Sequence, residues 1–300
     1  MLPLLFLATT GFRAAVFGGS GFIGSRCCKA LSDVGAEVVS ISRRGTPPEW
    51  AADAPWSSKV RWVKADAAED AAGPLAGGVD CVVSCIGSEG GRLLAADADG
   101  WAGWKWTDRE KAAYSKNYDT NWKVVGAAKA AGAQRFVYVG VSSDAEQGFA
   151  GPNPGLYTGK RAVALAAREA FGDNFIYFGP HQVVEKADDV RLKFATSRFA
   201  SGLRWLNDGV GEIRSFGPDY TTKTKLTPPI VLSDLALAIA AVATGRVDVE
   251  ESSRNAGMTV FAETFERDQY DIKDVLRHVD GTDAIAALAR RAEAAGMVAS

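Results

Sequence analysis

Near the N-terminus the chain carries glycine at every third position, within the run Gly18, Gly19, Ser20, Gly21, Phe22, Ile23 and Gly24. An apolar segment at 14–17 precedes this run, and a helix-compatible segment at 25–34 follows it. In such a strand–turn–helix unit the first glycine permits the turn, the second lets the backbone approach a pyrophosphate, and the third lets helix and strand pack closely. The unpaired N–H groups and the dipole of the helix start attract phosphate groups. The pattern therefore predicts a dinucleotide site, and a plain tight turn is the alternative.

The end of the next strand-like run bears on which dinucleotide binds. In NAD-binding units of this kind an acidic residue at that place bonds the ribose 2′-hydroxyl. This chain has Ser42 there, followed by Arg43 and Arg44. No carboxylate stands at this place to repel a 2′-phosphate, and a guanidinium group offers a planar set of donors that suits a phosphate. We therefore expect NADP(H) to be favoured over NAD(H), the alternative being that both arginines form a solvated strand end.

Strand and helix signals alternate through the first 180 residues and would position this site. Strand-like apolar runs fall at 13–17, 37–42, 60–64, 80–86, 135–141 and 174–178. Helix-compatible stretches between them lie at 25–34, 119–131 and 160–171. Near-continuous apolar strands separated by helices indicate a parallel sheet covered on both faces, joined by right-handed crossovers. The sequence thus predicts an α/β fold with a doubly wound parallel sheet of the Rossmann type.

The same signals suggest three parts of the chain. We expect residues 13–180 to form the dinucleotide-binding core, and residues 181–300 to form a small C-terminal lobe on the substrate side that is integrated with the core. Residues 1–12 are an apolar arm or the remnant of a targeting segment. They are too few for a transmembrane helix, which needs about 20 apolar residues.

Composition excludes several function classes. The chain has 300 residues, of which 47% are hydrophobic, so it can bury a large core. A formal net charge of −2 provides no basic surface for nucleic acid, and only two histidines argue against a multi-histidine metal site. The four cysteines, Cys27, Cys28, Cys81 and Cys85, fall in expected core elements, and we interpret them as reduced, buried thiols.

One long connection, residues 88–111, interrupts the alternation and contains Trp101, Trp104 and Trp106. A connection of this length within a compact domain usually has a function. The three tryptophans either cap the site or face a partner, or else they pack the connection onto its own domain.

Several motifs, taken in order, resemble those of the short-chain dehydrogenases/reductases in their extended and atypical branches, which include NAD-dependent epimerases and dehydratases. The matching pieces are the glycine run, Asp66, Asn121 in its helix, the segment 135–143, and Tyr157-Thr158-Gly159-Lys160-Arg161. The last piece, with Pro228-Pro229 and Tyr270-Asp271-Ile272, is similar to one atypical subgroup. That subgroup includes plastid and mitochondrial proteins linked to isoprenoid-quinone metabolism, and it is related to the nucleotide-binding accessory subunit of respiratory complex I.

The resemblance implies further cofactor contacts. Asp66 matches the residue that bonds the adenine amine, Cys85 and Gly87 belong to the strand end beside the cofactor, and the backbone of Pro180 would border the nicotinamide. Beyond the glycine run and the two arginines, the implied cofactor residues are Ala65, Asp66, Cys85, Gly87, Asn121, Lys160 and Pro180. His181 follows Pro180 and is either a proton donor or a structural residue.

The resemblance also implies a catalytic set, from which this chain departs. Reductases of the superfamily use a tyrosine as acid, a lysine four residues later, and a serine that orients the substrate carbonyl. Here Ser142 or Ser143 stands where the serine belongs, but Tyr157 precedes Lys160 by only three residues. Arg161 stands four residues after Tyr157, and an arginine cannot give up a proton. Either Tyr157 works with Lys160 in a shifted register, or the usual proton transfer is lost.

Three functions fit these residues. The first is an NADP(H)-dependent oxidoreductase on a small apolar carbonyl or quinone-type substrate. The second is a catalytically decayed NAD(P)-binding accessory or assembly protein of an organellar membrane complex or quinone-biosynthesis complex. The third is a sugar-nucleotide epimerase or dehydratase. The resemblance implies a chloroplast or mitochondrial location, as a soluble or peripheral membrane protein without a transmembrane segment.

Overall fold

The computed structural model describes residues 11–87, 108–142, 154–180, 183–185, 229–249 and 277–298. Several predictions fall outside these residues, namely those on residues 1–10, the three tryptophans at 101, 104 and 106, Ser143, His181, and the segment 270–272. They stay predictions.

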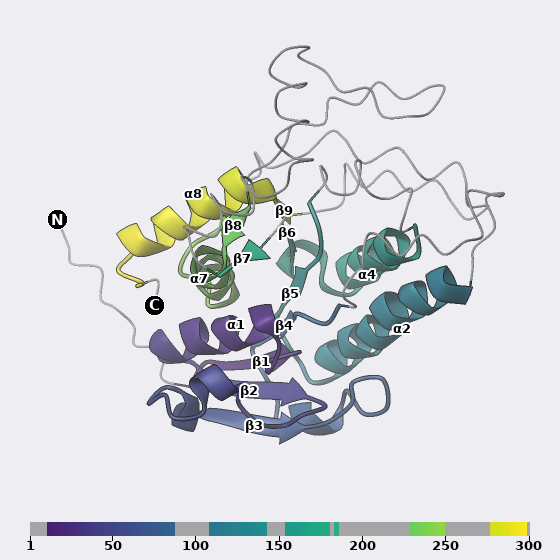
Figure 1. Cartoon of the computed structure of the whole chain (residues 1–300), viewed down its shortest axis with the longest axis horizontal. Coiled ribbons are helices and arrows are strands. Elements are labelled where there is room, and N and C mark those ends of the chain that lie inside the picture. The colour runs from purple at the N-terminus through teal and green to yellow at the C-terminus, as the bar shows by residue number, and fades with distance from the viewer. Residues whose placement is uncertain are drawn as a thin grey trace, which may run out of the picture.

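A single parallel sheet of seven strands forms the centre of the molecule (Figure 1). Its strands are β1 (Arg13–Phe17), β2 (Glu37–Ser42), β3 (Val60–Lys64), β4 (Cys81–Ser84), β5 (Arg135–Val139), β6 (Phe175–Gly179) and β9 (Arg277–Asp280). They are arranged in the order β3-β2-β1-β4-β5-β6-β9, and every neighbouring pair is parallel. A separate parallel pair joins β7 (Val183–Val184) to β8 (Ile230–Val231).

Helices cover both faces of the sheet, as a doubly wound fold requires. On one face lie α1 (Phe22–Asp33), α7 (Leu232–Ala243) and α8 (Gly281–Ala294), where α7 packs on α1 and α8 packs on α7. On the other face α2 (Asp108–Ala130) and α4 (Pro154–Phe171) pack side by side (Figure 1). Short 3-10 turns occur at Glu49–Ala51, Ser57–Lys59, Gly73–Leu75 and Gly172–Asn174. Among the helices in the described ranges, none has both the length and the hydropathy to cross a bilayer.

The predicted fold class is confirmed, and the differences lie in element ends. Strands β1, β2 and β3 have the predicted bounds, whereas β4 and β5 end two residues earlier than predicted. Helix α2 begins eleven residues before the predicted start at Asp119, and α4 begins six residues before Lys160. The first parts of both helices are rich in polar and small residues, and such residues give little hydrophobic periodicity. Strand β9 was not predicted, because Arg277-His278-Val279-Asp280 is short and mostly polar.

The topological switch point of the sheet, where open α/β folds hold ligands in a crevice, lies at the carboxyl ends of β1 and β4. After β1 the chain crosses the first face through α1, and after β4 it reaches α2 on the opposite face. The two crossovers diverge at this point, and ligands of open α/β sheets bind at such a switch point. The fold therefore places the glycine run, the end of β4 and the start of α4 around one edge of the sheet.

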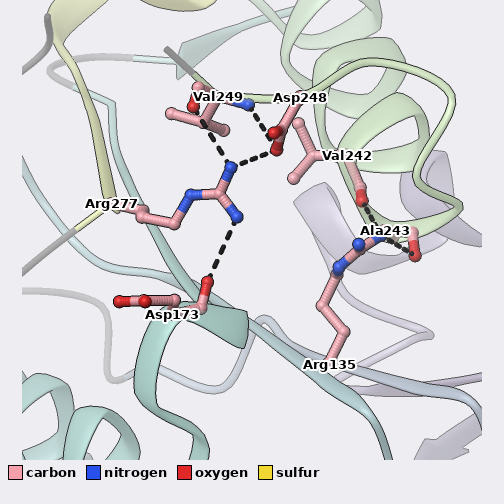
Figure 2. Close-up of polar contacts among 7 residues, drawn as sticks. All are labelled: Arg135, Asp173, Val242, Ala243, Asp248, Val249 and Arg277. Carbon is pink, nitrogen blue, oxygen red and sulfur yellow. Dashed lines mark hydrogen bonds and ion pairs between the residues drawn. The ribbon is translucent and has the colours of Figure 1, made fainter. Parts of the chain in front are cut away.

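Two arginines at the amino ends of β5 and β9 hold C-terminal parts of the chain, and Figure 2 shows their contacts. Arg135, at the start of β5, donates from Nη1 to the carbonyl oxygens of Val242 at 2.6 Å and Ala243 at 3.1 Å, at the end of α7. These carbonyls belong to the last turn of the helix, where the negative end of the helix dipole attracts positive charge, and the Val242 carbonyl also accepts from the N–H of Gly245 at 3.1 Å. Arg135 is thus a cap that the sheet supplies to α7.

Arg277, at the start of β9, holds the segment that follows α7 (Figure 2). Its guanidinium group donates to the carbonyl oxygens of Asp173 at 3.1 Å and Val249 at 3.2 Å, and it pairs with the carboxylate of Asp248. The side chain of Asp248 is 80% exposed, so the carbonyl contacts matter more than the ion pair.

We predict that Arg135→Met lowers the free energy of unfolding by about 1.5–3 kcal/mol, because charged hydrogen bonds to two helix-end carbonyls are lost. Asp248→Asn is the control, and removing its exposed charge should cost less than about 1 kcal/mol. Urea unfolding of both variants measures the difference. An equal, small effect in both variants would show that Arg135 does not cap α7.

Candidate functional site

The glycine run makes the tight turn between β1 and α1. Gly18 has a φ of +77°, which favours glycine, and a Cβ added there would lie 3.1 Å from the carbonyl oxygen of Cys85, the residue after β4. A Cβ on Gly24 would lie only 2.3 Å from the carbonyl oxygen of Gly18. The first glycine thus serves the turn and the third serves close packing, as the spacing predicts.

The start of α1 is open to an anion. Gly21 is the N-cap residue, no side chain caps the helix, and the first turn holds no acidic residue. Gly21 and Phe22 are exposed. The first N–H groups of a helix lack helical acceptors and favour negative charge. The turn therefore fits the pyrophosphate of a dinucleotide, and the second glycine stands where that group would approach.

The arginine-bearing loop after β2 is tied to the glycine run. Ser20 Oγ donates to the carbonyl oxygen of Thr46 at 2.6 Å and lies 2.8 Å from Ser42 Oγ. Because the Ser20 proton is used in this way, Ser42 donates to Ser20, and it also accepts from the N–H of Gly45 at 3.0 Å. Arg43 and Arg44 are exposed on the loop that these bonds hold. The loop that carries both arginines is thereby held against the glycine run.

Two residues of the predicted cofactor set, Ala65 and Asp66, lie at the end of β3. Ala65 donates its N–H to the carbonyl oxygen of Ser42 at 3.0 Å, which continues the sheet by one residue. Asp66 Oδ1 accepts from the N–H of Ala68 at 3.0 Å, and the side chain is half-buried. The carboxylate of Asp66 thus starts the turn after β3.

Asn121 shapes the turn after β4. Its side chain is fully buried, its Oδ1 accepts from Ser84 Oγ at 2.6 Å, and its Nδ2 donates to the carbonyl oxygens of Asn117 at 2.7 Å and Ile86 at 3.3 Å. These contacts commit its amide to the protein. Through Ser84 and Ile86, Asn121 therefore fixes the turn after β4, in which Gly87 follows.

Lys160 is buried between the end of β5 and the turn after β4. The residue is only 7% exposed, and its Nζ lies 3.4 Å from the carbonyl oxygen of Val139 at the end of β5. A Cβ built on Gly87 would lie 3.3 Å from this Nζ and 3.7 Å from Asn117 Oδ1, so the three residues meet in one place. Burial lowers the pKa of Lys160 to about 8, although the neighbouring Cys85 acts in the opposite direction.

The other predicted catalytic residues lie near the same strand end. Tyr157 is buried one helical turn before Lys160 in α4, and it packs with Leu156 against Val141. Ser142 is 1% exposed, and its N–H donates to the carbonyl oxygen of Pro180 at 3.1 Å. The structure thus brings Tyr157, Lys160, Ser142 and Pro180 to the ends of β5 and β6.

The structure agrees with the cysteine interpretation and adds two residues that sequence analysis missed. All four thiols are free, and Cys85 is the half-buried one. Asn117 is buried one turn before Asn121, and two asparagines four residues apart in a helix were a usable signal. Tyr177 on β6 lies among buried apolar neighbours, and nothing in the run Phe-Ile-Tyr-Phe distinguishes it.

The lowered pKa of Lys160 predicts a pH dependence of stability. Between about pH 8 and the ordinary lysine value of 10.5, the unfolded chain binds more protons than the folded one, so stability rises with pH in this window. Relative to Lys160→Met, the parent should gain on the order of 3 kcal/mol across the window and nothing below it. Urea unfolding from pH 7 to 10 measures the difference, with Lys116→Met on α2 as the control for a lost surface charge. A difference that stays flat above pH 8 contradicts the buried-lysine assignment.

Comparison with known proteins agrees with this geometry. Residues 14–158, just under half of the chain, match the NAD dependent epimerase/dehydratase family. The uncharacterized chloroplastic protein At1g32220 of Arabidopsis thaliana is 28% identical over 228 residues, which cover 76% of this chain and 70% of that protein. MIOREX complex component 2 of Saccharomyces cerevisiae is 41% identical over 56 residues, which cover 18% of this chain and 20% of that protein.

Among solved structures, a putative NAD-dependent epimerase/dehydratase from Bacillus halodurans superposes with a TM-score of 0.49 at 18% identity. The superposition covers 78% of this chain and 88% of that one. The glycine turn and the seven-stranded parallel sheet agree with this family match, so over residues 14–158 the chain is similar to the NAD dependent epimerases and dehydratases.

Proposed function

We propose that the protein is an NADP(H)-dependent oxidoreductase that acts on a small apolar carbonyl or quinone-type substrate. The observation that carries this proposal is the place of Lys160, a buried lysine between Gly87 and the Val139 carbonyl, at the switch point that the glycine turn opens. A bound nicotinamide dinucleotide supplies or accepts a hydride. The residues of the chain have to hold it, exclude water and move a proton.

Each group of site residues has a separate task in this proposal. The N–H groups at the start of α1 bind the pyrophosphate, and Arg43 and Arg44 bind the 2′-phosphate of the adenosine ribose. Lys160 binds the ribose next to the nicotinamide and favours the phenolate of Tyr157. Tyr157 gives a proton from its hydroxyl to the substrate oxygen, and the Ser142 hydroxyl orients that oxygen.

The shifted spacing of Tyr157 and Lys160 is compatible with this division of tasks. Residues three apart on a helix still share a face, and both side chains are buried on the side of α4 that meets the sheet. Near pH 8 the amino group of Lys160 exists in both protonation states, so it can pass a proton as well as bind the ribose.

A second candidate function is that of an accessory protein that binds the cofactor without turning it over. Two observations favour it. Leu156 occupies the place that the tyrosine takes in the usual four-residue spacing, and one relative is named as a component of a complex. An organellar location is proposed for either function, because another relative is named as chloroplastic. An epimerase or dehydratase remains the third candidate, on the strength of the family match.

We predict that NADPH binds more tightly than NADH by roughly ten- to hundredfold, because a charged contact to the 2′-phosphate is worth about 1.5–3 kcal/mol. The double variant Arg43→Ala/Arg44→Ala should lose most of this preference for NADPH, and its affinity for NADH should be unchanged. Arg290→Ala, which removes an exposed arginine from α8, is the matched control. Fluorescence titration with both cofactors measures the ratio. Equal affinities in the parent would remove the NADP(H) assignment.

We further predict that Tyr157→Phe lowers hydride transfer by about 10²–10⁴-fold, as the loss of a general acid does, with NADPH affinity nearly unchanged. Lys160→Met should weaken NADPH binding as well. Assays with quinones, aldehydes and ketones give the turnover. A parent that binds NADPH but reduces none of these substrates supports the accessory function, and unchanged turnover in Tyr157→Phe excludes tyrosine as the acid.

A further inference from the structure

Tyr177 on β6 holds the main chain that carries Ser142. Its hydroxyl donates to the carbonyl oxygen of Val141 at 3.0 Å and accepts from the N–H of Val141 at 2.8 Å. One side chain thus satisfies both main-chain polar groups of the residue before Ser142. Because β5 ends at Val139, these bonds lie beyond the regular ladder, where the sheet no longer fixes the chain.

Two strand-end glycines make room for this arrangement. A Cβ on Gly140 would lie 2.0 Å from both the Cζ and the hydroxyl oxygen of Tyr177, so the ring lies directly over Gly140. A Cβ on Gly179 would lie 2.7 Å from Nε2 of His278, so the histidine ring lies over Gly179 in the same way. Both rings lean from their own strand across the end of the neighbouring strand.

His278 supports the ring of Tyr177 from the far side. The two ring centroids are 4.7 Å apart with an interplanar angle of 88°, and an edge-to-face contact of this kind is favourable. His278 is 4% exposed, and its Nε2 lies 3.3 Å from Oδ1 of Asp280, the residue before α8. The unpredicted strand β9 therefore contributes a buried support that reaches Val141 through Tyr177.

From these contacts we propose that Tyr177 is a positioning residue for Ser142, and that His278 on β9 fixes Tyr177. The proposal rests on the proposed function, in which Ser142 orients the substrate oxygen. Tyr177 touches neither substrate nor cofactor in this account. It sets the direction in which the end of β5 presents Ser142, and the bond from Ser142 N–H to the Pro180 carbonyl completes the fixation.

The neighbouring tyrosine offers a matched control. Tyr138 occupies the paired position on β5, its ring is 5.8 Å from that of Tyr177, and both residues are buried. The hydroxyl of Tyr138 has no hydrogen-bond partner in the described part of the chain. Tyr138→Phe and Tyr177→Phe each remove one hydroxyl group, at paired positions of neighbouring strands. Only Tyr177→Phe removes hydrogen bonds.

The test combines amide hydrogen exchange at single-residue resolution with steady-state kinetics. In Tyr177→Phe the amide of Val141 should exchange roughly ten- to hundredfold faster, since it loses its acceptor, and the same amide in Tyr138→Phe should match the parent. With NADPH, the kcat of Tyr177→Phe should fall by about 10- to 100-fold at unchanged NADPH affinity, because misplacement of a positioned group is costly. A general loss of structure would instead weaken NADPH binding too.

The outcomes separate this proposal from the proposed function. Equal exchange of the Val141 amide in the two variants overturns the positioning role, whatever the activity. Loss of NADPH affinity together with kcat also overturns it, since the hydroxyl would then act on the whole site. If the parent shows no hydride transfer, the oxidoreductase function fails, while faster exchange at Val141 confined to Tyr177→Phe still supports the role of Tyr177 at the strand end.

Discussion

The close approach of two strand ends is the constraint on which the candidate site depends. The turn at Gly18 lies so near the Cys85 carbonyl that a single added carbon would be 3.1 Å from its oxygen, and the start of α1 lies still nearer to the turn itself. This packing holds β1, β4 and the start of α1 in one fixed arrangement. Because the chain leaves β1 and β4 toward opposite faces, the same contact lies at the switch point of the sheet. The start of α1, the loop with Arg43 and Arg44, and Lys160 all lie around this contact.

The two edges of the sheet are stabilised by different means. At the amino edge, Arg135 and Arg277 satisfy main-chain carbonyls and hold C-terminal parts of the chain. At the carboxyl edge, buried side chains satisfy the main chain where the ladders end, as Asn121 does after β4 and Tyr177 does after β5. A buried polar group without a partner is costly, so these side chains are needed wherever the chain leaves the sheet and stays buried. The result is a rigid edge on which a cofactor and a substrate can be positioned.

Much of the fold could be predicted because its signals are local. The strands β1, β2 and β3 are short apolar runs bounded by polar residues, and the spacing of the glycines indicates the turn after β1. Strand β9 could not be found, since four residues with two charges and a histidine do not look buried until β6 and α8 enclose them. The site was predicted where it depends on main-chain geometry, as at Gly18 and Gly24. It was missed where it depends on contacts between strands that are far apart in the sequence, as for Tyr177 and His278. Such a contact leaves no characteristic spacing of residues in the sequence.

We propose that a dinucleotide lies across this switch point, with its pyrophosphate on the glycine turn and its nicotinamide ribose at Lys160. A crystal structure of the protein with NADPH would locate both ends of the cofactor. We expect pyrophosphate oxygens within hydrogen-bond distance of the N–H groups at the start of α1, and Nζ of Lys160 moved from the Val139 carbonyl to the ribose hydroxyls. A cofactor bound elsewhere, or a Lys160 that remains on Val139 while the cofactor occupies the switch point, would contradict this proposal.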